Sequence, residues 1–471
     1  MDKTKKAKVL SINTLLFTSS NLGTRILSFL LVPLYTFVLS TEDYGKLDLV
    51  STTVQLLIPI LTLNIQDAVL RFCLDKEYAP SQSLKVGFRL AGLASIILGF
   101  SLLITNSIGI LPLEPMYIIY LCLSFTLNAF YVVFSMYLKA VNKVKTLVIC
   151  GILNTLITCS LNILLLLVIK LGVMGFLIAN ISAATVSIII MFISGRIFDA
   201  IRVDVPKGLT TTMIVYSLPL IVNSVSWWLN NASDRYILTF FYGAAINGIY
   251  AIAYKIPSIL SSVQSVFYNA WSISAITDFD ENDSDGFLGN VYMTYCCVSI
   301  VGCSFIMLFN VFLARILYAK EFFNAWRYVP PLLVGTVFCG IALFEGCLFV
   351  AVKRTREVSL TTILGAIVNT VFNFLLIPFI GAMGAAIATM LGYISIWGIR
   401  TIQMKKIIRI KANWLILITG LTLLIIQCIV GLLFSSSYWQ VPILLIILLS
   451  QRTYYTKVIQ LSKSRIAKRN S

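Results

Sequence analysis

The chain has 471 residues, of which 59% are hydrophobic and 12% charged, and its formal net charge is +17. A soluble domain carries about 25% charged residues, so the composition excludes an ordinary soluble protein. Histidine is absent, which excludes Ser-His-Asp catalysis and His-ligated metals. The ten cysteines show no C-x-x-C spacing. We therefore expect no catalytic residues, cofactor or metal, and we attribute the positive charge to contact with anionic lipid rather than with nucleic acid.

The apolar residues fall in runs long enough for helices that cross a bilayer, where backbone polar groups must be paired within the segment. The first run follows the basic start MDKTKKAK and is too long for a cleaved signal peptide. The last run is the weakest, because Gln451 and Arg452 shorten it. The expected spans are 12–39, 48–72, 86–110, 115–138, 147–169, 172–195, 211–242, 249–274, 288–314, 328–352, 358–379, 382–401, 413–434 and 439–456.

Lysine and arginine are distributed unevenly between the two sides of this map. With the N-terminus inside, and with basic residues near a span end counted with the adjoining loop, 28 of the 36 basic residues fall in inner loops and tails, five in outer loops and three well within spans. Basic residues favour the cytoplasmic side. The tally predicts a multi-pass membrane protein with both termini in the cytoplasm.

The inner loop DFDENDSDG (278–286) is acidic and resembles the start of a calcium-binding loop. The twelfth position of such a loop would be Tyr292, which cannot supply a bidentate carboxylate. We therefore favour a solvated linker over a calcium site.

An internal repeat divides the chain. GVMGFLIA (172–179) and GAMGAAIA (381–388) agree at five of eight positions with an offset of 209 residues, and STEDYGKL (40–47) relates to YGAAINGIY (242–250) at a similar offset. Spans 1–6 and 7–12 are then two copies of one unit in the same orientation, although recurring small residues at helix contacts are an alternative. The expected domains are an N-terminal lobe at 1–195, a cytoplasmic linker at 196–210, a C-terminal lobe at 211–404, and spans 13 and 14 with a basic tail at 405–471.

Three stretches resemble the polysaccharide transporter and O-antigen flippase family. They are NLGTRILSFLLVPLYTFVLSTEDYGKLDLV (21–50), LNIQDAVLRF (63–72) and NNASDRYILTFFYGAAINGIYAIAYKI (230–256). The larger superfamily also holds lipid II flippases and multidrug and toxin extrusion transporters. The resemblance implies an all-α integral membrane protein of about fourteen transmembrane helices. Two six-helix lobes, related by a pseudo-two-fold axis along the membrane normal, would enclose a central cavity, with two further C-terminal helices.

The resemblance also implies a function. Such a protein moves undecaprenyl-pyrophosphate-linked oligosaccharide units from the cytoplasmic to the outer leaflet by alternating access, for O-antigen, capsule or exopolysaccharide synthesis. A polymerase and glycosyltransferases of the same pathway would be its partners. The alternatives are a multidrug or cation antiporter, or a lipid II flippase, of the same superfamily. A membrane-embedded acyltransferase or polymerase is a further class, disfavoured because histidine and a large outer loop are missing.

Charged groups inside spans are costly and usually face protein or a water-filled cavity. Arg25 is the first candidate for a cavity cation that binds diphosphate, because a guanidinium pairs with phosphate oxygens and keeps its charge. The alternative is a structural salt bridge. Lys255 is the second candidate, with snorkelling toward the outer surface as its alternative, and Arg235 is the third.

Four acidic or paired positions complete the candidate site. Asp67 and Arg71 are spaced i, i+4, so they form either a local ion pair or a gate. Asp234 adjoins Arg235 and needs a partner elsewhere, because adjacent helical residues do not face each other. Glu345 lies in an apolar setting that favours a neutral carboxylic acid, which suits proton coupling, although a role as partner of Arg25 or Lys255 is equally open.

Overall fold

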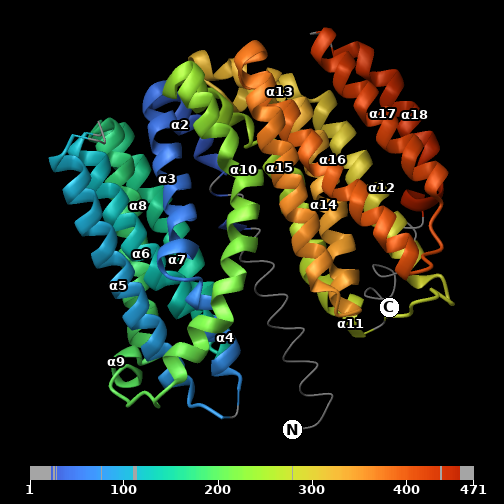
Figure 1. Ribbon diagram of the computed structural model, residues 1–471. Coiled ribbons are helices and arrows are strands. Elements are labelled where there is room, and N and C mark those ends of the chain that lie inside the picture. Colours follow the sequence, from blue (N-terminus) through green and yellow to red (C-terminus); the bar gives the residue numbers. More distant parts are fainter. Residues whose placement is uncertain are drawn as a thin grey trace, which may run out of the picture. The chain divides into compact units, whose positions relative to one another are not determined.

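The computed structural model describes residues 23–24, 27, 29–75, 77–109, 114–277, 279–434 and 437–456, and every regular element in these ranges is helical (Figure 1). The α-helices are α2 (Val32–Val38), α3 (Thr41–Leu61), α4 (Ile65–Cys73), α5 (Pro80–Ser107), α6 (Pro115–Ala140), α7 (Val144–Asn162), α8 (Gly172–Gly195), α9 (Ile197–Ala200), α10 (Leu209–Ala253), α11 (Pro257–Thr277), α12 (Phe287–Leu308), α13 (Asn310–Leu317), α14 (Val329–Ala351), α15 (Thr355–Ile380), α16 (Ala382–Ile407), α17 (Trp414–Leu433) and α18 (Val441–Ser450). Three short elements join them: the π-helical η1 (Ile163–Val168) and the 3₁₀ helices η2 (Lys320–Arg327) and η3 (Ser437–Gln440).

Within the described ranges, ten helices are long and apolar enough to cross a membrane, or eleven if the bent pair α3 and α4 counts as one span. The all-α membrane fold is therefore confirmed. The predicted number of fourteen spans is not: half of the predicted first span lies outside the described residues, and the last corresponds to a shorter apolar helix at Tyr438–Ser450.

The second predicted span is broken. α3 and α4 meet at an angle of 56°. Leu63 and Asn64, between the two helices, have positive φ values of 55° and 52°, in the left-handed region that an α-helix does not use. The Asn64 side chain accepts a hydrogen bond from Gln66 and donates one to Asp67 over 2.6 Å. Short polar side chains tolerate this conformation because they hydrogen-bond locally.

A second break lies in α10. Gly243 has φ 83° and ψ 171°, values that no helix contains, so the 45-residue element consists of two helices joined at a kink. Glycine permits this conformation because it has no Cβ. The predicted end of span 7 at residue 242 thus coincides with the kink.

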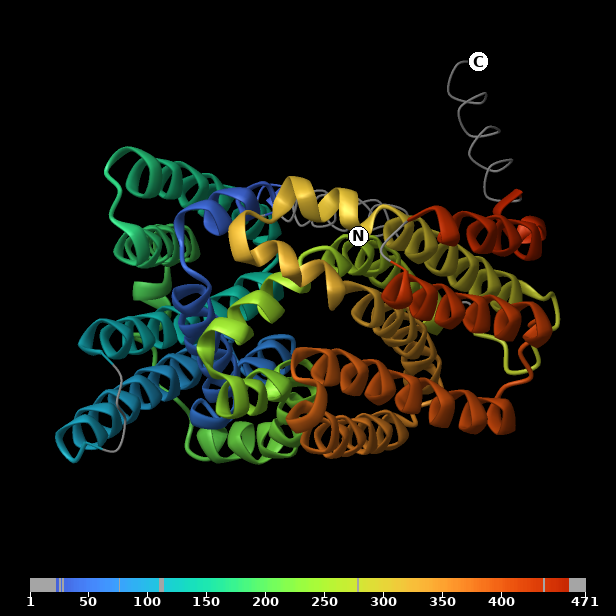
Figure 2. The ribbon, with the colours of Figure 1, turned by 90° about the horizontal axis from the view of Figure 1, so that it is seen from above.

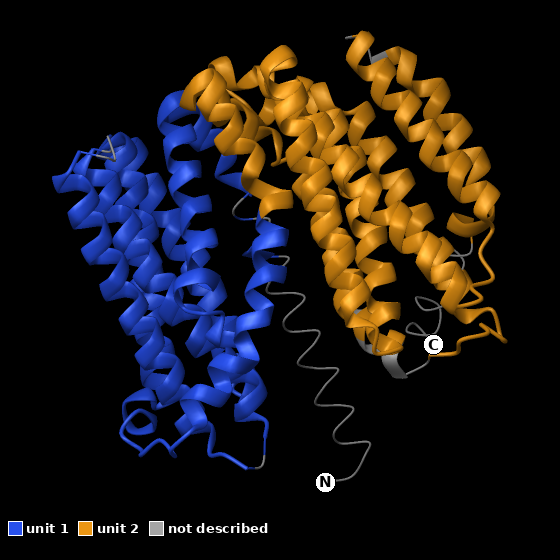
Figure 3. Cartoon of the chain, viewed as in Figure 1, with its two compact units in different colours: residues 1–228 blue, residues 229–471 orange. Residues whose placement is uncertain are grey.

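The chain forms two compact units, residues 1–228 and residues 229–471 (Figure 3). The division falls within α10 rather than in the stretch 196–210. The first half of α10 packs in unit 1, where Trp228 Nε1 donates to the Thr52 carbonyl oxygen over 2.8 Å and Ser224 donates to Asn64. The assignment of 1–195, 196–210, 211–404 and 405–471 to functional lobes and linker stays a prediction.

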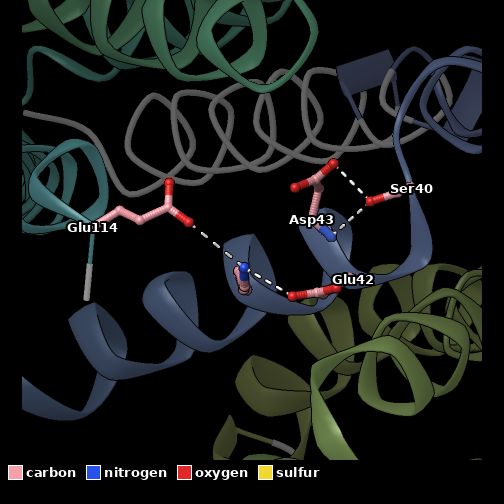
Figure 4. A network of polar contacts seen from close by, with 5 residues as sticks. Ser40, Glu42, Asp43 and Glu114 are labelled. Atoms are coloured by element: carbon pink, nitrogen blue, oxygen red, sulfur yellow. Dashed lines mark hydrogen bonds and ion pairs between the residues drawn. The ribbon is translucent and has the colours of Figure 1, made fainter. Parts of the chain in front are cut away.

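In unit 1, the start of α3 is fixed by a polar network (Figure 4). Ser40 caps the helix by accepting from the Asp43 backbone N–H over 3.0 Å, and its hydroxyl donates to the Asp43 carboxylate. Lys46 lies 2.9 Å from Glu42 and 3.7 Å from Glu114. Capping by serine and acidic residues in the first turn both stabilise a helix start. α3 is thereby joined to the residue preceding α6.

In unit 2, α14 is the central helix and α15 and α16 pack beside it (Figures 1 and 2). α17 and α18 pack against α12 through buried amides. Gln427 accepts from the Ser304 hydroxyl over 2.6 Å and donates to the Ser304 carbonyl oxygen and to Gln440. Such bonds hold helices together in a membrane, which gives the two C-terminal helices a packing role.

The loop at 278–286 is held by one buried carboxylate. Asp283 accepts from the backbone N–H groups of Leu288, Gly289 and Lys411, each over 2.9 Å. It therefore caps α12 and pins the segment that leads into α17. Asp283 is fully buried, so this part of the loop is not a solvated linker as predicted.

Candidate functional site

Unit 2 contains a pocket with a volume of about 300 Å³. Eleven of its sixteen lining residues carry a hydroxyl or amide side chain, and none carries a charge. They come from α10, the turn after it, α11, α12, α14 and α16. We call it the unit 2 pocket; its polar lining is Asn231, Tyr254, Ser258, Ser261, Gln264, Ser265, Tyr268, Tyr295, Thr336, Thr389 and Tyr393.

One face of α11 supplies much of the polar wall. Ser258, Ser261 and Ser265 recur at intervals of three and four residues, which places them on one side of a helix. Each hydroxyl donates to a backbone carbonyl three residues earlier. Their oxygen lone pairs therefore stay available as acceptors.

A glycine of α14, Gly340, makes room for two polar groups that line the pocket. A Cβ at Gly340 would lie 2.4 Å from Gln264 Nε2 and 2.6 Å from the Tyr295 hydroxyl. Gln264 is buried and donates to Ser299 over 3.3 Å. Only glycine lets α14 approach these two polar groups so closely.

Asp234 lies behind this pocket and is 1% exposed. Its Oδ2 atom accepts from three hydroxyls: Tyr250, Tyr254 at 3.0 Å and Thr389 at 3.1 Å. Its Oδ1 atom accepts from the Arg235 backbone N–H over 2.9 Å. A buried carboxylate is stabilised by several such donors. The partners that the sequence required for Asp234 therefore lie inside unit 2 and are hydroxyls.

One of the predicted cations adjoins the same wall. The Arg235 guanidinium carbon lies 5.0 Å from the centre of the Tyr254 ring, within cation–π range. Tyr254 and Thr389 both line the pocket and both bind Asp234. The structure thus brings Asp234 and Arg235 to one region. Lys255 directly follows Tyr254 in the chain and is half-buried.

Glu345 belongs to a separate cluster and is fully buried. Its Oε1 atom accepts from Tyr292 over 2.9 Å and from Thr401 over 2.7 Å. Its Oε2 atom has no hydrogen-bond partner in the described part of the chain. Of the two partners that the sequence offered, Lys255 is not among the groups bonded to it there, and Arg25 lies outside the described residues.

Arg400 lies in the same region of unit 2 and is 1% exposed. It donates to the hydroxyls of Thr361 and Thr362 and to the carbonyl oxygens of Ala342 and Val358. Gly346 makes room for it, since a Cβ there would lie 3.1 Å from Nη1. The sequence tally counted Arg400 as a loop residue, which was wrong: α16 continues to Ile407.

The remaining predicted residues lie in the N-terminal part of the chain. Asp67 accepts from Asn64, and the described contacts include no ion pair between Asp67 and Arg71, which is exposed. Both interpretations of the pair, a local ion pair and a gate, stay predictions. Arg25 falls outside the described residues. No group of three or more Cys, Asp or Glu residues in the described ranges is placed to bind a metal.

A family model described as "Polysaccharide biosynthesis protein" matches residues 10–272, which is more than half of the chain. No curated protein matches the chain in sequence. The resemblance drawn from residues 21–50, 63–72 and 230–256 is thereby confirmed at the level of the family.

Solved structures share the fold. A lipid II flippase, MurJ, in an inward closed conformation has a TM-score of 0.71 at 14% identity, covering 95% of this chain and 99% of that one. An inward-facing multidrug resistance MATE family transporter has a TM-score of 0.59 at 13% identity, covering 81% and 94%. A transporter of the same MOP superfamily from Pyrococcus furiosus, whose binding pocket is described as having reverse polarity, scores 0.53 at 15% identity, covering 83% and 95%.

Proposed function

Because the chain belongs to the polysaccharide biosynthesis protein family, we propose that it is a flippase for undecaprenyl-pyrophosphate-linked oligosaccharide repeat units. It moves them from the cytoplasmic to the outer leaflet by alternating access, for synthesis of a surface polysaccharide. One observation carries the proposal: eleven of the sixteen residues around the unit 2 pocket have hydroxyl or amide side chains within a mostly apolar lining surface, and Arg235 lies over the ring of one of them, Tyr254.

The uncharged lining suits a sugar. A pyranose presents several hydroxyls that both donate and accept, and buried polar groups must find partners. The serine oxygens of α11 and the tyrosine hydroxyls supply such partners, while the aromatic rings offer apolar faces for the C–H surface of the ring. The lining residues could therefore bind a sugar through hydrogen bonds and ring packing, without any ionic contact.

The cations suit the diphosphate of the lipid carrier. Arg235 and Lys255 flank Tyr254, and Arg25 is proposed as a third cation that meets the diphosphate from the cytoplasmic side. Arginine binds phosphate in a bidentate manner and lysine acts as a point charge. The same chain would therefore recognise both parts of an anionic glycolipid.

A cation or multidrug antiporter is disfavoured by the environment of the carboxylate. A cationic drug needs an accessible negative charge, but no acidic residue lines the unit 2 pocket. Asp234, the acidic residue behind it, is occupied by three hydroxyl donors and one backbone N–H. A lipid II flippase remains the second candidate, because the MurJ fold covers 95% of the chain and its substrate name also denotes a lipid.

The other assignments follow from this function. Glu345 is proposed to carry a coupling proton, and Asp67, Arg71 and Asp234 to take part in gating. We place the protein in a bacterial cytoplasmic membrane with both termini in the cytoplasm. Polymerase and glycosyltransferases of the same pathway would act beside it.

The proposal is tested with the purified chain in liposomes that contain a fluorescent undecaprenyl-pyrophosphate oligosaccharide. We expect the label to become accessible to an added quencher faster than in empty liposomes, and Arg235→Ala and Lys255→Ala to slow the transfer. Lys207→Ala, at an exposed position before α10, is the matched charge control. A transfer rate equal to that of empty liposomes contradicts the proposed flippase function. Selective transfer of lipid II favours the second candidate function, a lipid II flippase.

A further inference from the structure

We propose that unit 1 contains a second saccharide pocket, the counterpart of the unit 2 pocket, in which Gln55, Asn128 and Asn180 bind a neutral sugar ring. The inference rests on the proposed function and extends it by a site in the other half of the chain.

The pocket in unit 1 has a volume of about 270 Å³ and is lined by α3, α6, α7 and α8. Seven of its twelve lining residues are polar and none is charged. Small-molecule pockets begin at about 300 Å³, so both pockets are of a size for one small ring rather than for a large lipid. We call it the unit 1 pocket; besides the three amides named above, its polar lining is Ser51, Tyr120, Ser124 and Asn154.

The helices of the two units repeat at a nearly constant offset. α12, α14, α15 and α16 begin 207, 214, 211 and 210 residues after α5, α6, α7 and α8, respectively. TTVQ (52–55) in α3 recurs as SSVQ (261–264) in α11, and the octets at 172–179 and 381–388 recur at the same offset of 209 residues. The repeat thus includes helices that line both pockets.

The same offset relates individual lining residues. Gln55 corresponds to Gln264, Asn180 to Thr389 and Ala184 to Tyr393, and all six line a pocket. Equivalent positions on equivalent helices therefore form a polar recess in each unit. Accidental gaps between helices would not reproduce this correspondence.

Two amides of the unit 1 pocket do not act as links between helices. Asn128 donates to the Ser124 carbonyl oxygen and Asn180 to the Phe176 carbonyl oxygen, each over 2.8 Å and each within its own helix. Amides that hold membrane helices together bond across to a neighbour. Here each amide uses a donor locally and keeps its carbonyl oxygen as an acceptor, so the wall is rich in acceptors.

Gln55 is the most available of these groups. Its side chain is exposed and forms no hydrogen bond with any other described residue, whereas the equivalent Gln264 is buried and bonded to Ser299. An amide that both donates and accepts, next to carbonyl oxygens that accept, matches sugar hydroxyls. Neither a diphosphate nor a cationic drug finds an opposite charge in this lining.

The first experiment measures binding of a defined probe, methyl α-D-glucopyranoside, to the full chain in nanodiscs by saturation-transfer difference NMR. We expect a saturable signal that falls by about half in Gln55→Ala/Asn180→Ala, because the unit 2 pocket remains. Adding Gln264→Ala and Thr389→Ala should remove the rest. Thr105→Ala is the control, since this half-buried residue of α5 lies outside both pockets and bonds only within its own helix. Gln55→Leu serves as a second variant, because an exposed, unbonded side chain is not needed for folding.

The second experiment measures transfer of the fluorescent lipid-linked oligosaccharide by the same variants at equal reconstituted amounts. Loss of one or two hydrogen bonds to the sugar should slow transfer about tenfold. Two results overturn the inference: no saturable glycoside signal in the wild type, or wild-type binding and transfer in both Gln55 variants. Failure of the proposed function is distinct, since it would leave glycoside binding sensitive to Gln55 while the wild type transfers no lipid-linked sugar.

Discussion

The buried guanidinium of Arg400 donates from Nη1 to the main-chain carbonyl oxygen of Ala342 over 2.6 Å. Three further hydrogen bonds reach Thr361, Thr362 and the Val358 carbonyl oxygen on α15. One side chain of α16 therefore joins α14 to α15, and every acceptor around it in the described residues is neutral.

Replacing Arg400 should destabilise unit 2. Arg400→Met keeps an apolar stem but removes four hydrogen bonds from a charged donor, and hydrogen bonds to charged groups contribute about 1.5–3 kcal/mol each. We expect thermal unfolding in detergent to begin several degrees lower. Arg400→Lys should restore only part of the loss, because an ammonium lacks the planar fork that reaches both helices. The control is Arg354→Met, whose exposed guanidinium lies 3.7 Å from Glu357 and should contribute little. Equal effects of the two Met variants would refute the linking role.

Gly340→Ala should close part of the unit 2 pocket without unfolding the protein. The new methyl group would lie 2.4 Å from Gln264 Nε2, which must move away from Ser299. Because the atoms displaced are the ends of side chains and not backbone, the fold should adapt. We expect slower transfer of the lipid-linked oligosaccharide at unchanged expression and elution volume. Gly398→Ala, where a Cβ meets nothing within 4 Å, is the matched control. Wild-type transfer by Gly340→Ala would exclude the pocket from the substrate path.

Asp283→Ala should free the segment that leads into α17. Three buried backbone N–H groups would lose their acceptor, and each unsatisfied buried group costs about 1–3 kcal/mol. We expect faster hydrogen exchange at Leu288, Gly289 and Lys411 and faster proteolysis near Lys411. Asp285→Ala, which removes a single bond to the Phe287 N–H on the exposed side of the loop, is the control. Unchanged exchange at Lys411 would show that another contact holds this segment.

Apolar runs predicted most of the helices well. The expected spans at 115–138, 172–195 and 328–352 differ by at most two residues at either end from α6, α8 and α14. Length and hydropathy suffice in these cases, because a helix that crosses lipid must be continuous and apolar. The break at Asn64 was missed, since a left-handed residue leaves no mark in hydropathy.

The site was predicted less completely than the fold. Asp234, Arg235 and Lys255 stood out because charges are rare in spans, and the structure brings Asp234 and Arg235 to the wall at Tyr254. Arg400 was missed because a charge near the end of an apolar run resembles an interfacial residue, and TIQMKKI (401–407), which continues α16 after it, holds only three apolar residues. The hydroxyls of the pockets were missed because serine, threonine and tyrosine are common in membrane helices, and only their shared location distinguishes them.

Glu345→Gln should separate a coupling role from a structural one. The substitution keeps an oxygen that can accept from Tyr292 and Thr401, and it replaces the Oε2 atom, which has no partner among the described residues, with an amide nitrogen. Stability should therefore change little, whereas a proton can no longer be taken up and released. We expect wild-type transfer in liposomes to respond to an imposed pH gradient and the variant to transfer at one slow rate whatever the gradient. Glu357→Gln, on the accessible start of α15, should behave as the wild type. A variant that still follows the gradient would assign coupling to another group, and a wild type that ignores it would mean that transfer is not driven by protons.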